Sequence, residues 1–210
     1  MRAVFVLAAL AVSACGGPEE RALPYKTVPI TPFLGDAVMG DPKSPVEIVE
    51  YASTTCSHCY AFHKQALPEL RTRYIDTSKA HLRWIVMPTP PAEISVAGAA
   101  IARCAGEEKY FDVIADLFDT QDALIKAAPH PRRLQQTLVA LGGRHGLSAD
   151  QVGTCIADPA VLAVTRKGVE EAPASVTGTP SFFVNGEQID ENSAEAIAAA
   201  IDAKLAAAPN

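Results

Sequence analysis

The chain has 210 residues, of which 49% are hydrophobic and 20% are charged. This composition is typical of a globular protein, and the length suits one domain or one domain with an insertion. The formal net charge is −6, so the chain lacks the excess of basic residues that binds nucleic acid or anionic lipid. We therefore expect no nucleic-acid partner.

The first residues predict an export signal. Arg2 precedes an apolar run over residues 3–12 that is too short to span a bilayer. The sequence VSAC, which ends at Cys15, resembles the bacterial lipobox, where a signal peptidase cuts before a cysteine that then carries the lipid. We expect residues 1–14 to be a signal peptide and Cys15 to be lipidated. Plain secretion after cleavage at VSA is the alternative.

Residues 15–30 are rich in proline, glycine and charge and have no apolar period. They predict a tether between the lipid anchor and a domain that starts near residue 31. The cysteine count agrees with lipidation. Five cysteines leave one unpaired in an oxidising compartment, whereas lipidation of Cys15 leaves four, which can form two pairs.

A strand, a long helix and a second strand come first in the domain. SPVEIVEYAS, residues 44–53, is apolar on both faces, as expected of a central buried strand. A helix is expected over about 57–75, kinked rather than ended by Pro68 because its apolar face continues. HLRWIVMP, residues 81–88, predicts the next strand. The order is that of a βαβ unit.

Residues 93–172 show helical spacing throughout and contain no convincing strand. SFFVNGEQI, residues 181–189, predicts two short strands around a turn at Asn185 and Gly186. The chain then ends in an alanine-rich amphipathic helix over 193–209. The sequence thus predicts α/β structure interrupted by a helical block of about 80 residues.

The tetrapeptide CSHC, from Cys56 to Cys59, lies between the first strand and the long helix. At a helix start, unsatisfied N–H groups and the positive end of the helix dipole favour a thiolate at the first cysteine. Cys56 is therefore the expected nucleophile and Cys59 the resolving thiol. His58 can add positive charge or a hydrogen bond near Cys56, which lowers the thiol pKa and stabilises the reduced form.

Three features together resemble the DsbA family of periplasmic thiol:disulfide oxidoreductases. They are EYASTTCSHC at the strand-to-helix junction, TGTPSFFVNG at the later strand, and the helical insertion between them. The resemblance implies a thioredoxin-like fold in two parts, residues 31–92 and 173–210, with an inserted α-helical domain over 93–172. It also implies a periplasmic location, with a membrane reached only through the lipid anchor.

The resemblance also implies roles for single residues. Pro180 would be cis, and the backbone of Thr179 would pair with an extended client segment. Glu50 would lie buried beneath the cysteines as a proton shuttle for Cys59. A trans proline and an exposed Glu50 are the plainer alternatives. His63 lies four residues after Cys59, on the same side of the helix, and we expect it to be a surface residue.

Cys104 and Cys155 lie in separate predicted helices of the insertion. In an oxidising compartment we expect them to form a structural disulfide, worth on the order of 2–4 kcal/mol. Two buried free thiols are the alternative.

The expected function is that of a monomeric thiol oxidase of reduced client proteins. By resemblance, a quinone-linked membrane protein of the DsbB type would reoxidise it, and the reaction needs no organic cofactor and no metal. A disulfide isomerase or a dedicated reductase is the alternative, since Thr179 resembles the isomerase branch. A copper or zinc site built on Cys56, Cys59 and a histidine is a further alternative, although a structural zinc site usually has four ligands.

Overall fold

The computed structural model describes residues 21–207, so the predicted signal peptide and Cys15 lie outside the described residues. The elements are β1 (Ala37–Met39), β2 (Val46–Ala52), α1 (Ser57–Ala61), η1 (Phe62–Ala66), α2 (Leu67–Leu70), η2 (Arg71–Ile75), β3 (Ala80–Val86), α3 (Ala92–Ala105), η3 (Glu107–Lys109), α4 (Tyr110–Asp119), α5 (Gln121–Ala127), α6 (Pro131–Arg144), α7 (Ala149–Ile156), α8 (Pro159–Glu170), β4 (Ser181–Val184), β5 (Glu187–Ile189) and α9 (Ala194–Ala207).

The strands form one sheet in the order β1-β3-β2-β4-β5. β2 runs parallel to β3 and antiparallel to β4, which makes it the central strand. β1 is antiparallel to β3 at the edge of the sheet. β1 was not predicted from the sequence, because a strand of three residues has too little alternation to be recognised without its neighbour.

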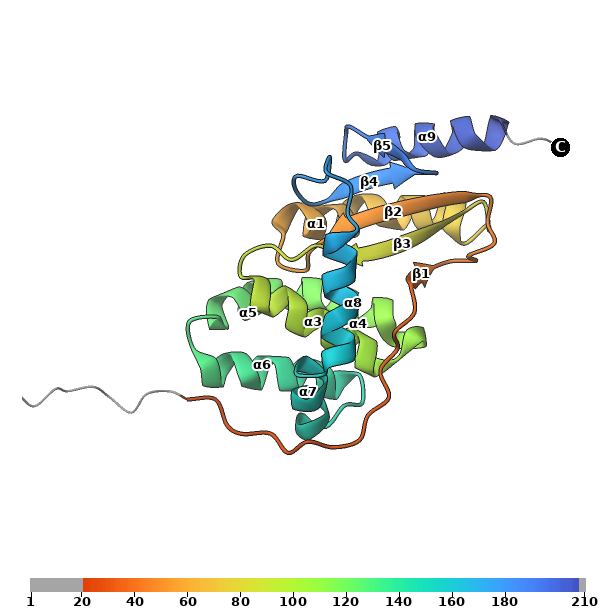
Figure 1. The fold of residues 1–210 in the computed structure, drawn as a ribbon. Helices are drawn as coiled ribbons and strands as arrows, with labels where there is room; N and C mark the ends of the chain where they lie inside the picture. Colours follow the sequence, from red (N-terminus) through yellow and green to blue (C-terminus); the bar gives the residue numbers. More distant parts are fainter. Residues whose placement is uncertain (1–20, 208–210) are drawn as a thin grey trace, which may run out of the picture.

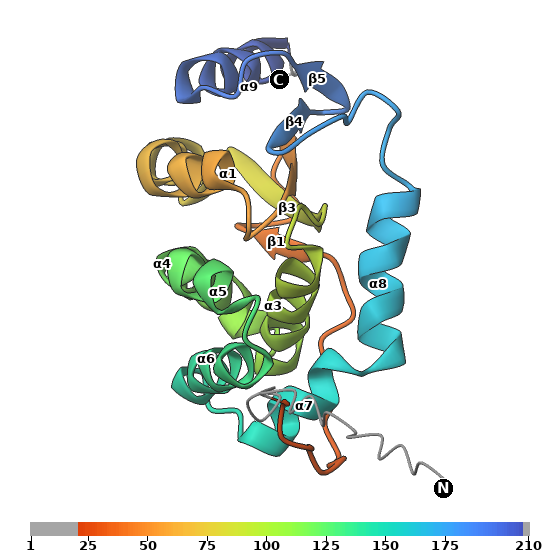
Figure 2. The same ribbon diagram turned by 90° about the vertical axis from the view of Figure 1, so that its left-hand side faces the viewer.

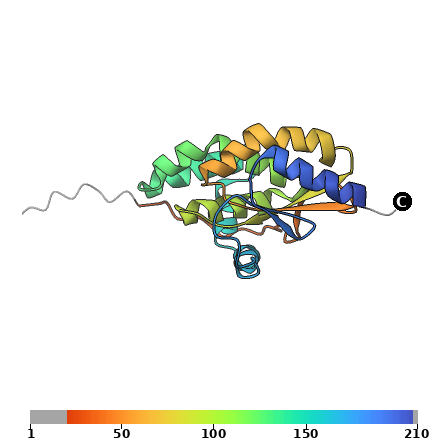
Figure 3. The same cartoon turned by 90° about the horizontal axis from the view of Figure 1, so that it is seen from above.

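Helices cover both faces of the sheet (Figures 1 and 2). The helix that begins with α1 and the C-terminal α9 lie on one face, and α8 stands on the other, as the view from above shows (Figure 3). Helices α3 to α7 of the insertion pack against one side of this sandwich, whereas α8 is the last helix of the insertion (Figures 1 and 2). Side chains of β2 alternate between the two faces: Ile48 belongs to the main core, whereas Val49 and Tyr51 form a second cluster with Phe183 on the other face.

The helical stretch after Cys56 continues from α1 to the end of η2 and includes two turns of π-helix. The first π turn, η1, lies directly before Pro68, which is in the first turn of α2. A proline ring clashes with the carbonyl four residues earlier, and the wider π turn relieves this contact. The helix therefore passes Pro68 without ending.

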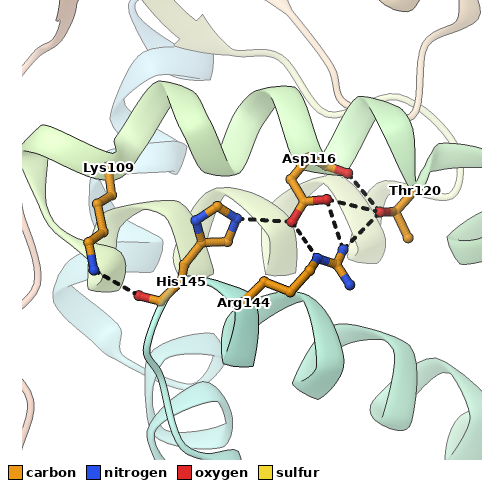
Figure 4. Close-up of polar contacts among 5 residues, drawn as sticks. All are labelled: Lys109, Asp116, Thr120, Arg144 and His145. Atoms are coloured by element: carbon orange, nitrogen blue, oxygen red, sulfur yellow. Dashed lines mark hydrogen bonds and ion pairs between the residues drawn. The ribbon is translucent and has the colours of Figure 1, made fainter.

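Side-chain contacts bind the helices of the insertion to one another. A disulfide between Cys104 and Cys155 joins α3 to α7. Asp116 of α4 accepts hydrogen bonds of 2.7 and 2.8 Å from Arg144 and one of 2.9 Å from the ring of His145, at the C-terminal end of α6 (Figure 4). Lys109 donates to the His145 carbonyl at 3.2 Å. These contacts link α3 to α7 and α4 to the end of α6 within the insertion.

The described part of the predicted tether, residues 21–30, lies along the insertion at α6 and α7 (Figure 2). The backbone N–H and C=O of Leu23 bond to the side chain of Gln135 at 2.7 and 2.6 Å. The N–H of Val28 donates to Thr154 Oγ1 at 3.1 Å. Every residue type can make such bonds through its backbone, so they require no apolar period in the sequence. The sequence alone therefore predicted a tether here.

Candidate active site

Cys56 and Cys59 lie where the central strand passes into its following helix. β2 ends at Ala52, and Cys56 is the N-cap residue of α1 with an extended backbone. Cys59 lies in the first turn of α1 and is 0% exposed, whereas Cys56 is half-buried. Both are free thiols in this structure. The strand-to-helix junction thus presents the first sulfur and buries the second.

The surroundings of Cys56 stabilise its thiolate. A hydrogen bond from the Cys59 thiol, opposed by burial and assisted by backbone N–H groups of His58 and Cys59, lowers the pKa of Cys56 to about 4. This agrees with the anion-stabilising effect of a helix N-terminus. The His58 side chain is exposed, so the contact found for this residue is through its backbone.

Cys59 has the opposite character. The hydrogen bond that it donates to Cys56, together with burial and the nearby charge of Glu50, raises its pKa far above that of an ordinary thiol. The two sulfurs therefore differ strongly in acidity. Cys56 is the thiolate and Cys59 the protonated partner, which is the division of labour that thiol–disulfide exchange requires.

A cis-proline loop lies beside the dithiol, at the end of the sheet where β2 ends and its neighbour β4 begins. The Thr179–Pro180 peptide bond is cis, and the sulfur of Cys56 lies 3.2 Å from the carbonyl oxygen of Thr179. Asn192, just before α9, donates a 2.8 Å hydrogen bond to the carbonyl of Pro180. A groove of about 590 Å³ runs from this loop past His58 to the start of α9. The predicted client-binding loop thus lines the groove and contacts the nucleophile, Cys56, through the carbonyl of Thr179.

Glu50 and His63 form a buried pair beneath the cysteines. Glu50 is 0% exposed, and its two carboxylate oxygens lie 3.0 and 3.2 Å from Nε2 of His63. The His63 side chain is only 7% exposed, so the expectation that His63 is a surface residue is wrong. Trp84 of β3 and Phe118 of the insertion cover its ring, and sequence spacing does not show packing between such distant segments.

Gln121 and a group of hydroxyls are site residues that the sequence analysis missed. The amide nitrogen of Gln121, at the start of α5, donates to the carbonyl oxygens of Thr54 and Cys56 at 2.8 and 3.1 Å. The buried hydroxyl of Ser53 contacts that of Thr55 at 2.8 Å. The three hydroxyl residues at 53–55 were a usable signal for such a network, whereas a lone glutamine in a helix offers none.

Within residues 21–207, no group of three or more histidine, cysteine or acidic side chains could hold a metal ion, so the structure offers no ligand set for the alternative of a metal site. Cys104 and Cys155 are joined to each other. Within the same residues, every helix is too short or too polar to cross a bilayer.

A thiolate at the start of a helix, a buried second thiol and a facing cis-proline loop define a dithiol protein of the thioredoxin fold. A family model described as thioredoxin matches residues 34–203. The structure of Wolbachia pipientis alpha-DsbA1 is 26% identical, with a TM-score of 0.71 over 83% of this chain and 93% of that one. The chain belongs to the DsbA-like family, and the predicted thioredoxin-like fold with an α-helical insertion is confirmed.

Curated relatives point the same way. A Rickettsia conorii protein provisionally named a protein-disulfide oxidoreductase is 32% identical over 173 residues, or 81% of this chain and 60% of its own length. A similarly named Rickettsia bellii protein is 31% identical over 178 residues, covering 83% of this chain and 66% of its own length. The chain thus spans about three-fifths to two-thirds of the length of these relatives.

Proposed function

We propose that this protein is an exported thiol:disulfide oxidoreductase that introduces disulfides into reduced client proteins. The observation that carries the proposal is the contrast between Cys56, half-buried with a pKa of about 4, and the buried, protonated Cys59. A stabilised Cys56 thiolate favours the reduced dithiol over the disulfide. The Cys56–Cys59 disulfide is therefore an oxidant.

The reaction starts from that disulfide. A client thiolate attacks the sulfur of Cys56, the bond to Cys59 breaks, and Cys59 leaves and takes up a proton. A second client thiolate then attacks the client sulfur of the mixed disulfide. Cys56 leaves as a thiolate, and its low pKa makes it a good leaving group. The client gains a disulfide and the protein gains two electrons, with no organic cofactor or metal.

The groove beside Thr179 suits a client in extended conformation. Its floor is the cis-proline loop, whose Thr179 carbonyl lies 3.2 Å from the Cys56 sulfur. A client strand that pairs with the loop backbone would bring its cysteine to Cys56 largely independently of its sequence. Reoxidation would fall to a quinone-linked membrane protein of the DsbB type.

The cellular setting is part of the proposal. Residues 1–14 would direct export, a lipid on Cys15 would hold a monomeric domain at a membrane, and the domain would work in the periplasm. The disulfide between Cys104 and Cys155 supports an oxidising compartment, since such bonds are rare where thiols are kept reduced. Mass spectrometry of the mature N-terminus should find a lipidated Cys15, and an unmodified N-terminus would contradict the anchor.

A disulfide isomerase or a dedicated reductase is the second candidate. Thr179 before the cis proline favours it, as this residue type resembles that branch of the family. These candidates share the dithiol chemistry and differ in the reduction potential.

The test is equilibration of the purified protein with glutathione buffers, followed by an assay with a reduced client. We expect an oxidising potential and disulfide formation in the client, with both reactions abolished by Cys56→Ser. The Cys104→Ala, Cys155→Ala double variant is the matched control, since it removes two cysteines outside the site. A thioredoxin-like reducing potential would replace the oxidase with the reductase.

A further inference from the structure

The groove beside Thr179 has two walls that come from distant parts of the chain. Side chains of the long helical stretch form one wall, and the cis-proline loop with the start of α9 forms the other. The residues of the helical wall are His58, Ala61, Phe62, Gln65, Ala66 and Glu69. Their spacing of three and four residues places them along one side of the helix. The groove therefore follows the helix away from the dithiol for about three turns.

The length of this path corresponds to a short stretch of extended client. From His58 to Glu69 the helix advances about 16 Å, at about 1.5 Å per residue. An extended chain advances about 3.3 Å per residue, so about five client residues cover the same path. Cys56 lies at the near end, where its sulfur contacts the carbonyl of Thr179. A client side chain about five residues from the reacting cysteine therefore reaches the far end.

The middle of the groove is lined by small apolar side chains. Ala61 and Ala66 come from the helical wall, and Ala194 comes from the start of α9. Phe62 also lines the groove, but it is only 4% exposed, so most of its ring lies beneath the surface. These side chains offer neither charge nor hydrogen bonds to a client. Discrimination between client sequences must therefore come from the polar groups at the ends.

Two carboxylates line the part of the groove that is distant from the dithiol. Glu69 belongs to α2 and Glu195 to the first turn of α9, and both residues are exposed. The two helices meet just beyond them, where the hydroxyl of Tyr74 donates to the carbonyl of Ala198 at 3.4 Å. Among the described residues that line the groove, none is a lysine or an arginine. This part of the groove is therefore electronegative.

No cation of the described chain neutralises these two carboxylates. Arg73, one turn after Glu69, is bound to Asp202 at 2.9 Å. Within residues 21–207, neither Glu69 nor Glu195 has a hydrogen-bond or ion-pair partner for its carboxylate. Like charges that line one groove repel each other, and a cation between them is attracted to both. The occupant that fits this end of the groove is therefore a basic side chain.

We infer that the groove selects clients with a lysine or arginine about five residues from the reacting cysteine, and that Glu69 and Glu195 bind this side chain. The long methylene chain of lysine or arginine can lie over the alanines while its charge reaches the carboxylates. This selection adds to backbone pairing with the cis-proline loop, which does not depend on the client sequence. The inference deepens the proposed function and rests on its thiol–disulfide exchange at Cys56.

The test compares synthetic peptides in a single turnover of the oxidised, full-length protein. Each peptide has two reduced cysteines and one lysine or one glutamate about five residues away, on either the N-terminal or the C-terminal side. Acid quenching and alkylation of the thiols give the rate constants. At low ionic strength we expect the lysine peptide to react about fivefold faster than the glutamate peptide, or more, on at least one side. In about 1 M salt, where the Debye length is about 3 Å, the two should react at similar rates.

Variants assign the selection to the two carboxylates. Glu69→Gln combined with Glu195→Gln should bring the lysine-to-glutamate rate ratio to within about twofold of one, and Glu69→Lys combined with Glu195→Lys should invert it. Because every variant meets the same peptides, the intrinsic reactivity of the peptide thiols cancels. Glu108→Gln combined with Glu170→Gln is the matched control, since it removes two exposed carboxylates outside the groove. It should keep the ratio of the unaltered protein.

The outcomes separate the selection from the chemistry on which it rests. Equal rates for the lysine and glutamate peptides on both sides, in the unaltered protein at low ionic strength, would overturn the selection alone. A preference that survives the double substitution to glutamine, or the double substitution to lysine, would overturn it as well. Failure of the oxidised protein to react with any of the peptides would instead overturn the proposed function.

Discussion

Gln121, the first residue of α5, donates a 3.1 Å hydrogen bond to the carbonyl oxygen of Cys56. The same amide donates to Thr54 at 2.8 Å. A residue of the helical insertion thereby holds the loop that leads into the dithiol helix. The insertion is thus part of the support of the active site as well as an addition to the fold.

We expect Gln121→Ala to destabilise the protein by about 1–3 kcal/mol, because the buried Thr54 carbonyl loses its donor and the part-buried Cys56 carbonyl keeps only the N–H of Tyr60. Attack by Cys56 on oxidised glutathione should slow as the loop loses its support. Denaturant unfolding and stopped-flow kinetics measure the two effects. Gln188→Ala is the matched control, since the Gln188 amide makes a 3.4 Å bond at an exposed position, and it should change stability by less than about 0.5 kcal/mol. Equal effects of the two substitutions would contradict the support role.

The low pKa of Cys56 makes the stability of the reduced protein depend on pH. The folded thiol titrates at about 4, well below an unfolded thiol at about 8.5. Between these two pH values the folded protein carries a Cys56 thiolate, whereas the unfolded protein carries a thiol. The free energy of unfolding of the reduced protein therefore increases as pH rises from about 4 to about 8.5, and this stabilisation is lost as pH falls to about 4. Thiolate absorbance should show the midpoint, and denaturant titration the slope. Cys56→Ser should show neither the thiolate titration at about 4 nor the increase in stability with pH. A thiolate midpoint near 8.5 in the unaltered protein would refute the prediction.

Removal of the insertion disulfide should destabilise the protein without affecting the dithiol. Cys104 and Cys155 are 51 residues apart, and a loop of that length corresponds to about 4 kcal/mol of unfolded-state entropy in the chain-entropy model. The Cys104→Ala, Cys155→Ala double variant should unfold at lower denaturant concentration. Its Cys56 titration should remain at about 4. A shifted Cys56 titration would show that the disulfide also shapes the active site.

Gly153 holds the N-terminal segment on the insertion. A Cβ at this position would overlap the ring of Tyr25, so Gly153→Ala should displace residues 21–30 from α6 and α7. Limited proteolysis should then cut this segment faster, while Cys56 reactivity stays unchanged. Gly143→Ala in α6 is the control, because a Cβ there meets nothing within 4 Å and a helical alanine adds up to about 1 kcal/mol of stability. Equal cleavage of both variants would argue against the contact.

Most of the fold could be predicted because local patterns specify it. The apolar run at 44–53, the helical period after Cys56 and the asparagine–glycine turn at 185–186 are each read within one segment, and each agrees with the structure. β1 escaped prediction because its identity depends on pairing with β3. The contacts of residues 21–30 escaped because their partners are more than 100 residues away.

The site divides in the same way. The sequence by itself determined that Cys56 begins a helix after a buried strand, because a cysteine pair at that junction experiences the unsatisfied N–H groups of the first turn wherever the helix is packed. Only the tertiary structure decided what surrounds the pair. Thr179, 123 residues away in the sequence, contacts the sulfur of Cys56 through its carbonyl oxygen, and the His63 side chain points inward and contacts the carboxylate of Glu50. The packing of a helix against a sheet selects which side chains become buried, and the helical period alone cannot specify that choice.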